Sequence, residues 1–315
     1  MVRTSTAGTN NHRCPSCGDA LTQDASGKGF VAHVSNRSCL FERGQRDAAG
    51  LPVAVRVVGQ PTLPDHQPTG GVRVCGYSER GIFNALLYDI GFSADPVSAL
   101  AGLLSLVRIP GAAVDFSGLE GAEVLVEQSL SDFGDADVIL LLHGAGWNRV
   151  VFIEGKVKPS QRGSWTATRA WRDFQERKNG YLHSSNLFTQ LYHKVRFMST
   201  LRVGGIDALQ AGVPFPACST NELRKLGRNA VVLRAARMIE RYATEAFYIA
   251  ALPDSVSNLT DFYANQLMAG PADDVTGWDI AGWGFVAWEQ VEAYCRQHGL
   301  HSTVRTFEFN RGQIY

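Results

Sequence analysis

Two stretches of this sequence decide its fold, Gly134-Asp-Ala-Asp-Val-Ile-Leu-Leu-Leu-His143 and Val150-Val-Phe-Ile-Glu-Gly-Lys156. Each contains an apolar run of strand length, and turn-forming residues lie on either side of both runs. Residues 122–129, just upstream, have the same extended character. The sequence therefore predicts three consecutive strands that pair as an antiparallel meander.

The turn between the second and third strands brings two carboxylates and a lysine together. A turn centred between Ala145 and Gly146 places Asp137 opposite Glu154, with the Cβ atoms about 5 Å apart. Side chains two residues apart on a strand share a face, so Glu154 and Lys156 point the same way. Two carboxylates this close raise each other's pKa unless a cation lies between them.

A divalent hard metal ion is the natural cation for this pair. Mg²⁺ takes a few carboxylate oxygens, keeps several waters and binds substrate phosphate. A neighbouring lysine can position an attacking water or stabilise developing negative charge. Asp137 and Glu154 are therefore the expected ligands of Mg²⁺ or Mn²⁺, with Lys156 as a catalytic lysine, and the group suits phosphodiester hydrolysis.

Helices and further strands are expected around the meander, in an α/β order. A helix runs from Ser78, as its N-cap, to Gly91, and a second short helix starts near Asp95. The expected downstream elements are helices over residues 168–178, 186–200 and 221–242, a strand over 246–252, a strand over 284–288, a helix over 289–298 and a strand over 304–309.

The order helix, three strands, helix, strand resembles the PD-(D/E)xK nuclease superfamily over roughly residues 76–252. The restriction-endonuclease-like core of that family is αβββαβ, with an Asp at the start of the second strand and Glu-x-Lys on the third. Asp137 and Glu154-Gly155-Lys156 occupy those places. The resemblance implies a metal-dependent nuclease, most naturally a DNA endonuclease of restriction, phage defence or repair.

The resemblance also assigns roles on two helices. Glu79 matches an extra glutamate that many members carry on the first helix, although a carboxylate in a first helical turn is also favourable by itself. Gln190 and Lys194, four residues apart, match the Gln and basic residue that members often place on the helix after the third strand.

Two departures from the family pattern leave alternatives open. Gly134-Asp135-Ala136-Asp137 replaces the Pro-Asp pair, so Asp135 rivals Asp137, and Lys158 could substitute for Lys156. The hairpin register favours Asp137 and Lys156. Glu127, on the first strand, is a lesser candidate ligand.

Basic residues are dense just after the third strand and could line a phosphate-binding groove, or could form an ordinary solvated helix face. Trp165 and Trp171 lie among them and suit contacts to bases or sugars, although Trp171 suits the core equally well. The candidate nucleic-acid contacts are Lys158, Arg162, Arg169, Arg172 and, from the later helix, Lys194.

A second metal site is expected near the N-terminus. His12-Arg-Cys14-Pro-Ser-Cys17 resembles the first knuckle of a zinc ribbon, and its partner pair should follow about 15–25 residues later. The predicted structural zinc ligands are Cys14, Cys17, His33 and Cys39, with His12 in reserve. A Cys14–Cys17 redox pair, or an iron–sulfur cluster that uses Cys75, is the alternative.

Composition limits what the chain can be. Its 315 residues are 45% hydrophobic and 19% charged, as in ordinary globular proteins. Lys plus Arg equals Asp plus Glu at 30 each, so nucleic-acid binding must come from local patches. The apolar runs are shorter than the roughly 18 residues of a membrane span, and we expect a cytoplasmic protein without a membrane partner.

We expect a zinc-binding module over residues 1–50, a strand and Pro-rich linker over 51–72, and a nuclease domain over 73–315. Two other functions use the same residues: a ribonuclease, since the metal chemistry does not select DNA, and a non-catalytic nucleic-acid-binding module of a larger complex. A homo-oligomer or a protein partner is compatible with either.

Overall fold

The computed structural model describes residues 21–23, 30–33, 75–157, 165–176, 185–211, 225–267 and 280–314. The chain divides into two compact units, Met1–Gln67 and Pro68–Tyr315. In the first unit, β1 (Leu21–Gln23) and β2 (Phe30–His33) pair antiparallel. The predicted linker, the predicted strand over 51–58 and the zinc ligands Cys14, Cys17 and Cys39 lie outside the described residues.

The second unit is built on a five-stranded mixed sheet, so the predicted α/β class is confirmed. Strands β3 to β5 form an antiparallel meander, as predicted, and β6 and β7 extend it in parallel to β5. In sheet order the strands are β3 (Leu119–Ser129), β4 (Asp135–Gly144), β5 (Trp147–Gly155), β6 (Glu245–Leu252) and β7 (Trp283–Ala287).

The hairpin between β4 and β5 has the predicted register. Val138 pairs with Ile153 at one end and Gly144 with Trp147 at the other. Gly146 in the turn has φ +80°, a conformation that glycine adopts without strain. Asp137 and Glu154 therefore occupy the next opposed positions beyond the last ladder pair.

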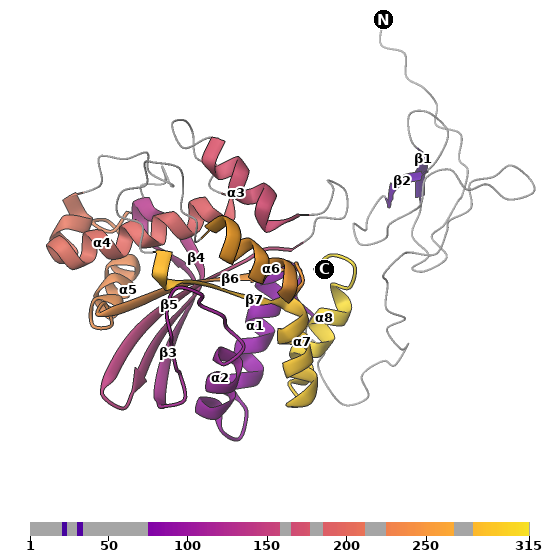
Figure 1. Ribbon diagram of the computed structural model, residues 1–315, viewed down its shortest axis with the longest axis horizontal. Coiled ribbons are helices and arrows are strands. Elements are labelled where there is room, and N and C mark those ends of the chain that lie inside the picture. The colour runs from indigo at the N-terminus through magenta and orange to yellow at the C-terminus, as the bar shows by residue number, and fades with distance from the viewer. Residues whose placement is uncertain are drawn as a thin grey trace, which may run out of the picture. The chain divides into compact units, whose positions relative to one another are not determined.

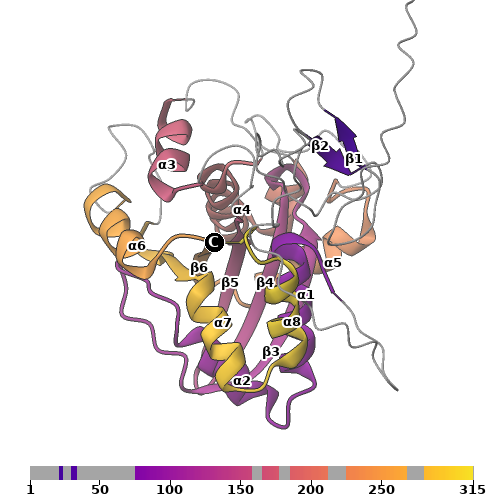
Figure 2. The same cartoon turned by 90° about the vertical axis from the view of Figure 1, so that its right-hand side faces the viewer.

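Helices cover both faces of the sheet (Figure 1). Alternate residues of β4 supply the two cores: Val138, Leu140 and Leu142 face one, and Ile139 and Leu141 face the other. The first core is covered by α1 (Ser78–Gly91), α2 (Pro96–Leu104), α7 (Trp288–Gln297) and α8 (His301–Phe309), which lie in front of the strands in Figure 2.

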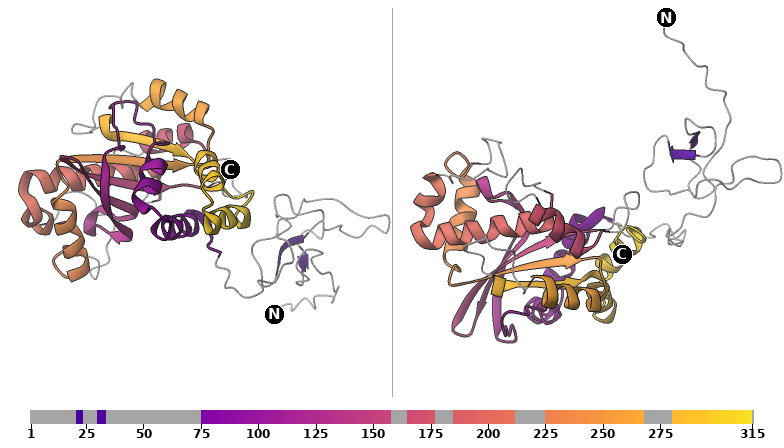
Figure 3. Two further views of the ribbon diagram at one scale, coloured as in Figure 1. Left: turned by 90° about the horizontal axis from the view of Figure 1, so that it is seen from below. Right: turned by 45° about the horizontal axis from the view of Figure 1, so that its top comes forward.

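The second core is covered by the helices that follow β5 in the chain. The long helix α4 crosses the sheet, as the right panel of Figure 3 shows, and it has a break in its helical geometry at Gly205. Short helical turns lie at Ser131–Phe133, Tyr263–Leu267 and Ile280–Gly282. The helices on this face are α3 (Ala167–Glu176), α4 (Leu187–Ala211), α5 (Ala230–Glu240) and α6 (Val256–Phe262).

Helix starts were predicted with mixed success. Helix α2 starts next to Asp95 as expected, and the Asp95 carboxylate caps it by accepting the Ser98 N–H at 3.0 Å. Ser78 is not the N-cap of α1: Tyr77 occupies that position, and the Ser78 N–H donates to the side chain of Asn310 at 2.9 Å. A side chain from the end of α8 thus accepts a backbone N–H group from the first turn of α1.

Downstream, α4 continues to Ala211 instead of ending near residue 200, α6 was not predicted, and two further elements differ from the prediction. Residues 304–309 belong to the helix α8 rather than to a strand, because the buried Thr303, Thr306 and Phe307 recur at helical spacing. Within the described part of residues 221–242, the helix begins only at Ala230, where the Asn229 side chain accepts two backbone N–H groups.

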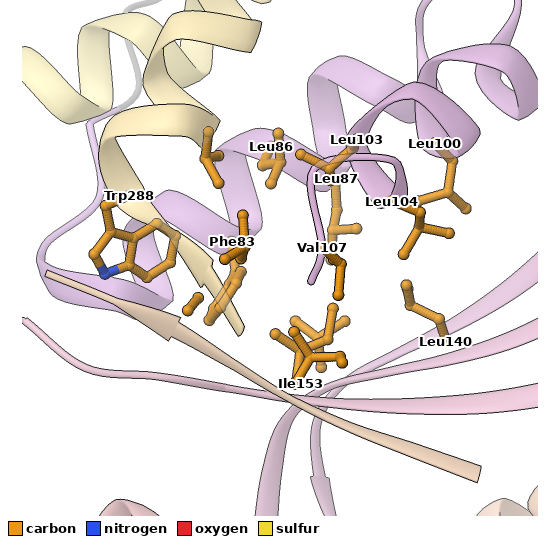
Figure 4. A pocket seen from close by; sticks show the side chains of 15 residues that line it. Phe83, Leu86, Leu87, Leu100, Leu103, Leu104, Val107, Leu140, Ile153 and Trp288 are labelled. Carbon is orange, nitrogen blue, oxygen red and sulfur yellow. The ribbon is translucent and has the colours of Figure 1, made fainter. Parts of the chain in front are cut away.

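A small cavity of about 40 Å³ lies between α1, α2 and the sheet (Figure 4). Its lining is hydrophobic, with Phe83 and Trp288 at one end and Leu100 and Leu104 at the other. Such a cavity has no polar group to orient a charged substrate, so we interpret it as imperfect core packing. Across the part of the chain that is described, no helix is both long and apolar enough to span a membrane.

Candidate active site at the ends of β4 and β5

Asp137 binds the backbone of the Glu-Gly-Lys segment directly. Because β4 and β5 are antiparallel, the start of β4 and the end of β5 meet at one edge of the sheet. There the Asp137 Oδ2 atom accepts the Gly155 N–H at 2.8 Å. The bond continues the hairpin beyond the Val138–Ile153 pair and holds the Asp137 carboxylate beside Glu154.

Glu154 is the most deeply buried carboxylate of this site, with a side chain that is 0% exposed. Its Oε1 atom lies 2.8 Å from Nζ of Lys194 on α4. Burial raises the pKa of Glu154, Lys194 and Lys156 lower it, and the Asp137 charge raises it further. Among the described residues, the Oε2 atom has no hydrogen-bond partner.

Lys156 and Gln190 are brought together as the resemblance implied. The Lys156 ammonium donates to Gln190 Oε1 at 2.5 Å, so the end of β5 is joined to α4. The Lys156 backbone makes two further hydrogen bonds. Its N–H donates to the Ala251 carbonyl at 3.0 Å, and its carbonyl accepts the Trp288 indole N–H at 2.7 Å. Lys156 is half-buried, so its ammonium is partly shielded from water.

Glu79 lies next to the same segment because Gly155 lets α1 approach. A Cβ added to Gly155 would lie 2.8 Å from the Glu79 Cβ and 2.8 Å from the Phe83 ring. Only glycine at the middle of Glu-Gly-Lys permits this packing. The predicted glutamate of the first helix is therefore adjacent to the motif, as the family pattern implies.

The outer side of the site is acidic. Glu127 interrupts the β3–β4 pairing with φ +50° and forms an ion pair with Arg80 at 3.0 Å. Burial is the main cause that raises the pKa of Glu127, Arg80 opposes it, and the charges of Asp137, Asp135 and Glu79 add to the rise. These carboxylates are thus close enough to repel one another.

Asp135 is the alternative to Asp137, and its backbone makes a contact of its own. Its carbonyl oxygen accepts a hydrogen bond from the Lys194 ammonium at 2.5 Å. The direct bond from the Asp137 carboxylate to Gly155 favours Asp137 as the ligand partner of Glu154.

Lys194 does not lie where a nucleic-acid contact would be. Its side chain is 1% exposed and is enclosed between Glu154 and the start of β4, so the predicted contact with phosphate is corrected here to an internal ion pair. The sequence carried a signal: Lys194 follows Leu187 and Leu191 on the apolar stripe of its helix.

Helix α3 carries two of the predicted nucleic-acid contacts. Arg169 and Arg172 are exposed on this helix. Trp171 is buried against Phe174 and Phe188, so its core interpretation is the correct one. Lys158 and Arg162 lie outside the described residues.

Trp288 was not identified from the sequence. It follows Lys156 by 132 positions, and no spacing or motif links the two. Only the parallel addition of β7 to β6 carries the start of α7 to the end of β5.

The pair of carboxylates suits a metal ion that keeps most of its waters. Nowhere in residues 75–157, 165–176, 185–211, 225–267 and 280–314 do three or more His, Cys, Asp or Glu side chains form a preassembled cage. The buried Glu154 Oε2 atom beside Asp137 nevertheless offers oxygen ligands of the kind that Mg²⁺ takes in small number.

Comparison with known proteins found no match at any level. No family model matches the chain, and neither a curated protein nor a solved structure matches it.

Proposed function

We propose that this chain is a metal-dependent nuclease of the PD-(D/E)xK type that hydrolyses phosphodiester bonds, with DNA as its substrate. The observation that carries the proposal is the bond from Asp137 to the Glu154-Gly155-Lys156 backbone. It assembles two carboxylates and a lysine at one sheet edge, within elements that follow the order αβββαβ. A solvated surface motif would not need a fully buried Glu154.

Asp137 and Glu154 are the residues that would hold Mg²⁺ or Mn²⁺, with Glu79 beside them. When bound there, the ion supplies Lewis-acid stabilisation of a phosphate and a more acidic water. Lys156 contributes a positive charge whose position is set by Gln190 at 2.5 Å and by its fixed backbone. Such a preorganised ammonium can hold a water or stabilise charge that develops on the phosphate.

Arg169 and Arg172 on α3 are the described side chains best suited to bind the DNA backbone. Both are exposed, and arginine binds phosphate through paired N–H donors. Lys158 and Arg162 would extend the same contact. Binding through these residues predicts an affinity that falls as the salt concentration rises.

A structural zinc ion in residues 1–50, held by Cys14, Cys17, His33 and Cys39, completes the proposal. Thiolate and imidazole ligands suit a closed zinc site, whereas the carboxylates of the nuclease site suit Mg²⁺. The two metal sites thus differ in chemistry and in the unit of the chain that carries them.

The test is cleavage of plasmid DNA, single-stranded DNA and RNA by the full-length chain with Mg²⁺, Mn²⁺ or EDTA. We expect metal-dependent cleavage of DNA that falls at least about 100-fold in Asp137→Asn, Glu154→Gln and Lys156→Met. Glu123→Gln, at an exposed position of β3, is the matched control and should cleave normally.

Four outcomes would change the proposal. Undiminished cleavage in both carboxylate variants would refute the assigned site. Loss in Asp135→Asn with full activity in Asp137→Asn would move the ligand to Asp135. Cleavage of RNA alone would make the chain a ribonuclease, and specific DNA binding without any cleavage would make it a binding module.

A further inference from the structure

The buried ion pair between Lys194 and Glu154 takes no direct part in the proposed hydrolysis. Lys194 Nζ lies 2.8 Å from Glu154 Oε1 and donates to the Asp135 carbonyl at 2.5 Å. The side chains of Lys194 and Glu154 are 1% and 0% exposed. Both charges are therefore removed from water and depend on each other.

A buried lysine at this position of α4 is unfavourable in free energy. Leu187, Leu191 and Met198 are buried on the same helix, so the position belongs to the apolar core. Removing two charges from water often costs more than their mutual attraction returns, and an apolar side chain of similar length would avoid that cost. The cost is offset only if the charge of Lys194 has a partner, and Glu154 is that partner.

The two oxygens of Glu154 have different surroundings. Neither oxygen has a hydrogen-bond partner of good geometry among the residues that the structure describes, but Oε1 forms the ion pair with Lys194. Asp137 occupies the opposed position on β4 and contacts the next residue, Gly155. One side of the Glu154 carboxylate thus has a resident cation, and the other is left for a ligand.

We propose that Lys194 is the internal counter-cation of Glu154 and takes the place of a second metal ion, so that the site binds one divalent cation. A second divalent ion at Oε1 would meet the ammonium at close range, where like charges repel strongly in a low-dielectric interior. Lys194 acts through Glu154 and is a positioning residue. This inference rests on the proposed nuclease function.

The first test counts metal ions. Mn²⁺ binding to the full-length chain, followed by electron paramagnetic resonance, should saturate at about one ion per chain above the Glu154→Gln background. Two ions per chain that are both lost in Glu154→Gln would overturn the inference.

The second test asks whether Lys194 and the metal ion do the same electrostatic task. In Lys194→Met, Glu154 loses its internal counter-cation, so the metal-free protein should melt at a lower temperature and Mn²⁺ should restore much of the loss. The Mn²⁺-induced rise in melting temperature should be roughly twice that of the wild type or more. Lys225→Met is the matched control, because Lys225 pairs with Asp132 rather than with Glu154, and its rise should resemble the wild type.

A double variant keeps the test decisive where Lys194→Met does not fold. Glu154→Gln with Lys194→Met removes both charges, so it should fold without metal and show no Mn²⁺-induced rise. A double variant that also fails to fold, or an equal rise in Lys194→Met and wild type, would reduce Lys194 to a packing role. Such a result leaves the nuclease proposal intact, whereas a wild-type chain that binds no Mn²⁺ refutes both.

Discussion

The indole N–H of Trp288 donates to the carbonyl oxygen of Lys156 at 2.7 Å. Trp288 begins α7, and its ring packs on Phe83 of α1 and Phe307 of α8, with ring centroids 5.2 and 6.1 Å away. The backbone of the candidate catalytic lysine is therefore held by a helix outside the αβββαβ elements. The last two helices of the chain become part of the support of the site.

Trp288→Phe should weaken cleavage more than it weakens the fold. Phenylalanine keeps an aromatic ring in the same space but leaves the Lys156 carbonyl without its donor, at a cost of about 1–3 kcal/mol in the free energy of unfolding. Because small displacements of a catalytic group cost rate, we expect kcat to fall roughly tenfold. Urea unfolding and steady-state cleavage measure the two effects.

Tyr294→Phe on the same helix is the control for this prediction. It removes a hydrogen bond from the Tyr294 hydroxyl to the Ala99 carbonyl at 2.8 Å, away from the motif. A comparable loss of stability with unchanged cleavage is expected. Equal losses of cleavage in both variants would show that α7 acts only through general stability.

The register of the β4–β5 hairpin could be predicted from the sequence. The glycine-containing turn determines the β4–β5 register, which in turn brings Asp137 beside Glu154-Gly155-Lys156. These interactions are local in the chain, within about 20 residues, and local patterns specify register well. Gln190 was reached only through the resemblance to a family.

The remaining parts of the site depend on packing between distant elements. The buried state of Lys194 follows from how α4 crosses the sheet, and a single lysine in an amphipathic helix also fits a solvated face. Residues 304–309 were misread because their apolar residues suit a strand, while tertiary burial of Thr303, Thr306 and Phe307 selects a helix.

Gly155→Ala should push α1 away from the end of β5. The added methyl group would lie 2.8 Å from both the Glu79 Cβ and the Phe83 ring, closer than carbon atoms approach. We expect a loss of about 1–3 kcal/mol in the free energy of unfolding, together with reduced cleavage. Gly121→Ala on β3 is the control, since a Cβ there meets nothing within 4 Å, and chemical denaturation should show little change.

His193 should make the fold less stable in acid. Burial, followed by the charges of Lys194 and Arg196, lowers the pKa of His193 from 6.5 to about 4. Between these two pH values, His193 is protonated in the unfolded chain but neutral in the folded chain. The free energy of unfolding therefore falls as the pH drops from the pKa of the unfolded state to that of the folded state. The loss is at most about 3 kcal/mol near pH 4.

The contribution of His193 is the difference between wild type and His193→Gln in the dependence of the free energy of unfolding on pH. Glu154, whose pKa is raised in the folded chain, acts with the opposite sign, because its contribution is lost as the pH rises. Urea unfolding of wild type and His193→Gln between about pH 4 and pH 7 should show a shallower acid loss in the variant. His301→Gln, at an exposed position, should follow the wild type, and a parallel profile for His193→Gln would contradict the prediction.

The two proposed metals should separate by their chemistry. We expect about one zinc per chain as purified, lost in Cys14→Ser or Cys39→Ser, since a closed thiolate site loses affinity with each ligand. The main thermal transition should remain in these variants, because the sheet and its two cores lie within Pro68–Tyr315.

Brief EDTA treatment should stop cleavage reversibly while the zinc stays bound, because oxygen-only sites that retain waters exchange their ion readily. Elemental analysis that finds iron, or no metal together with a Cys14–Cys17 disulfide, would refute the zinc site and leave the nuclease site to be judged by cleavage alone.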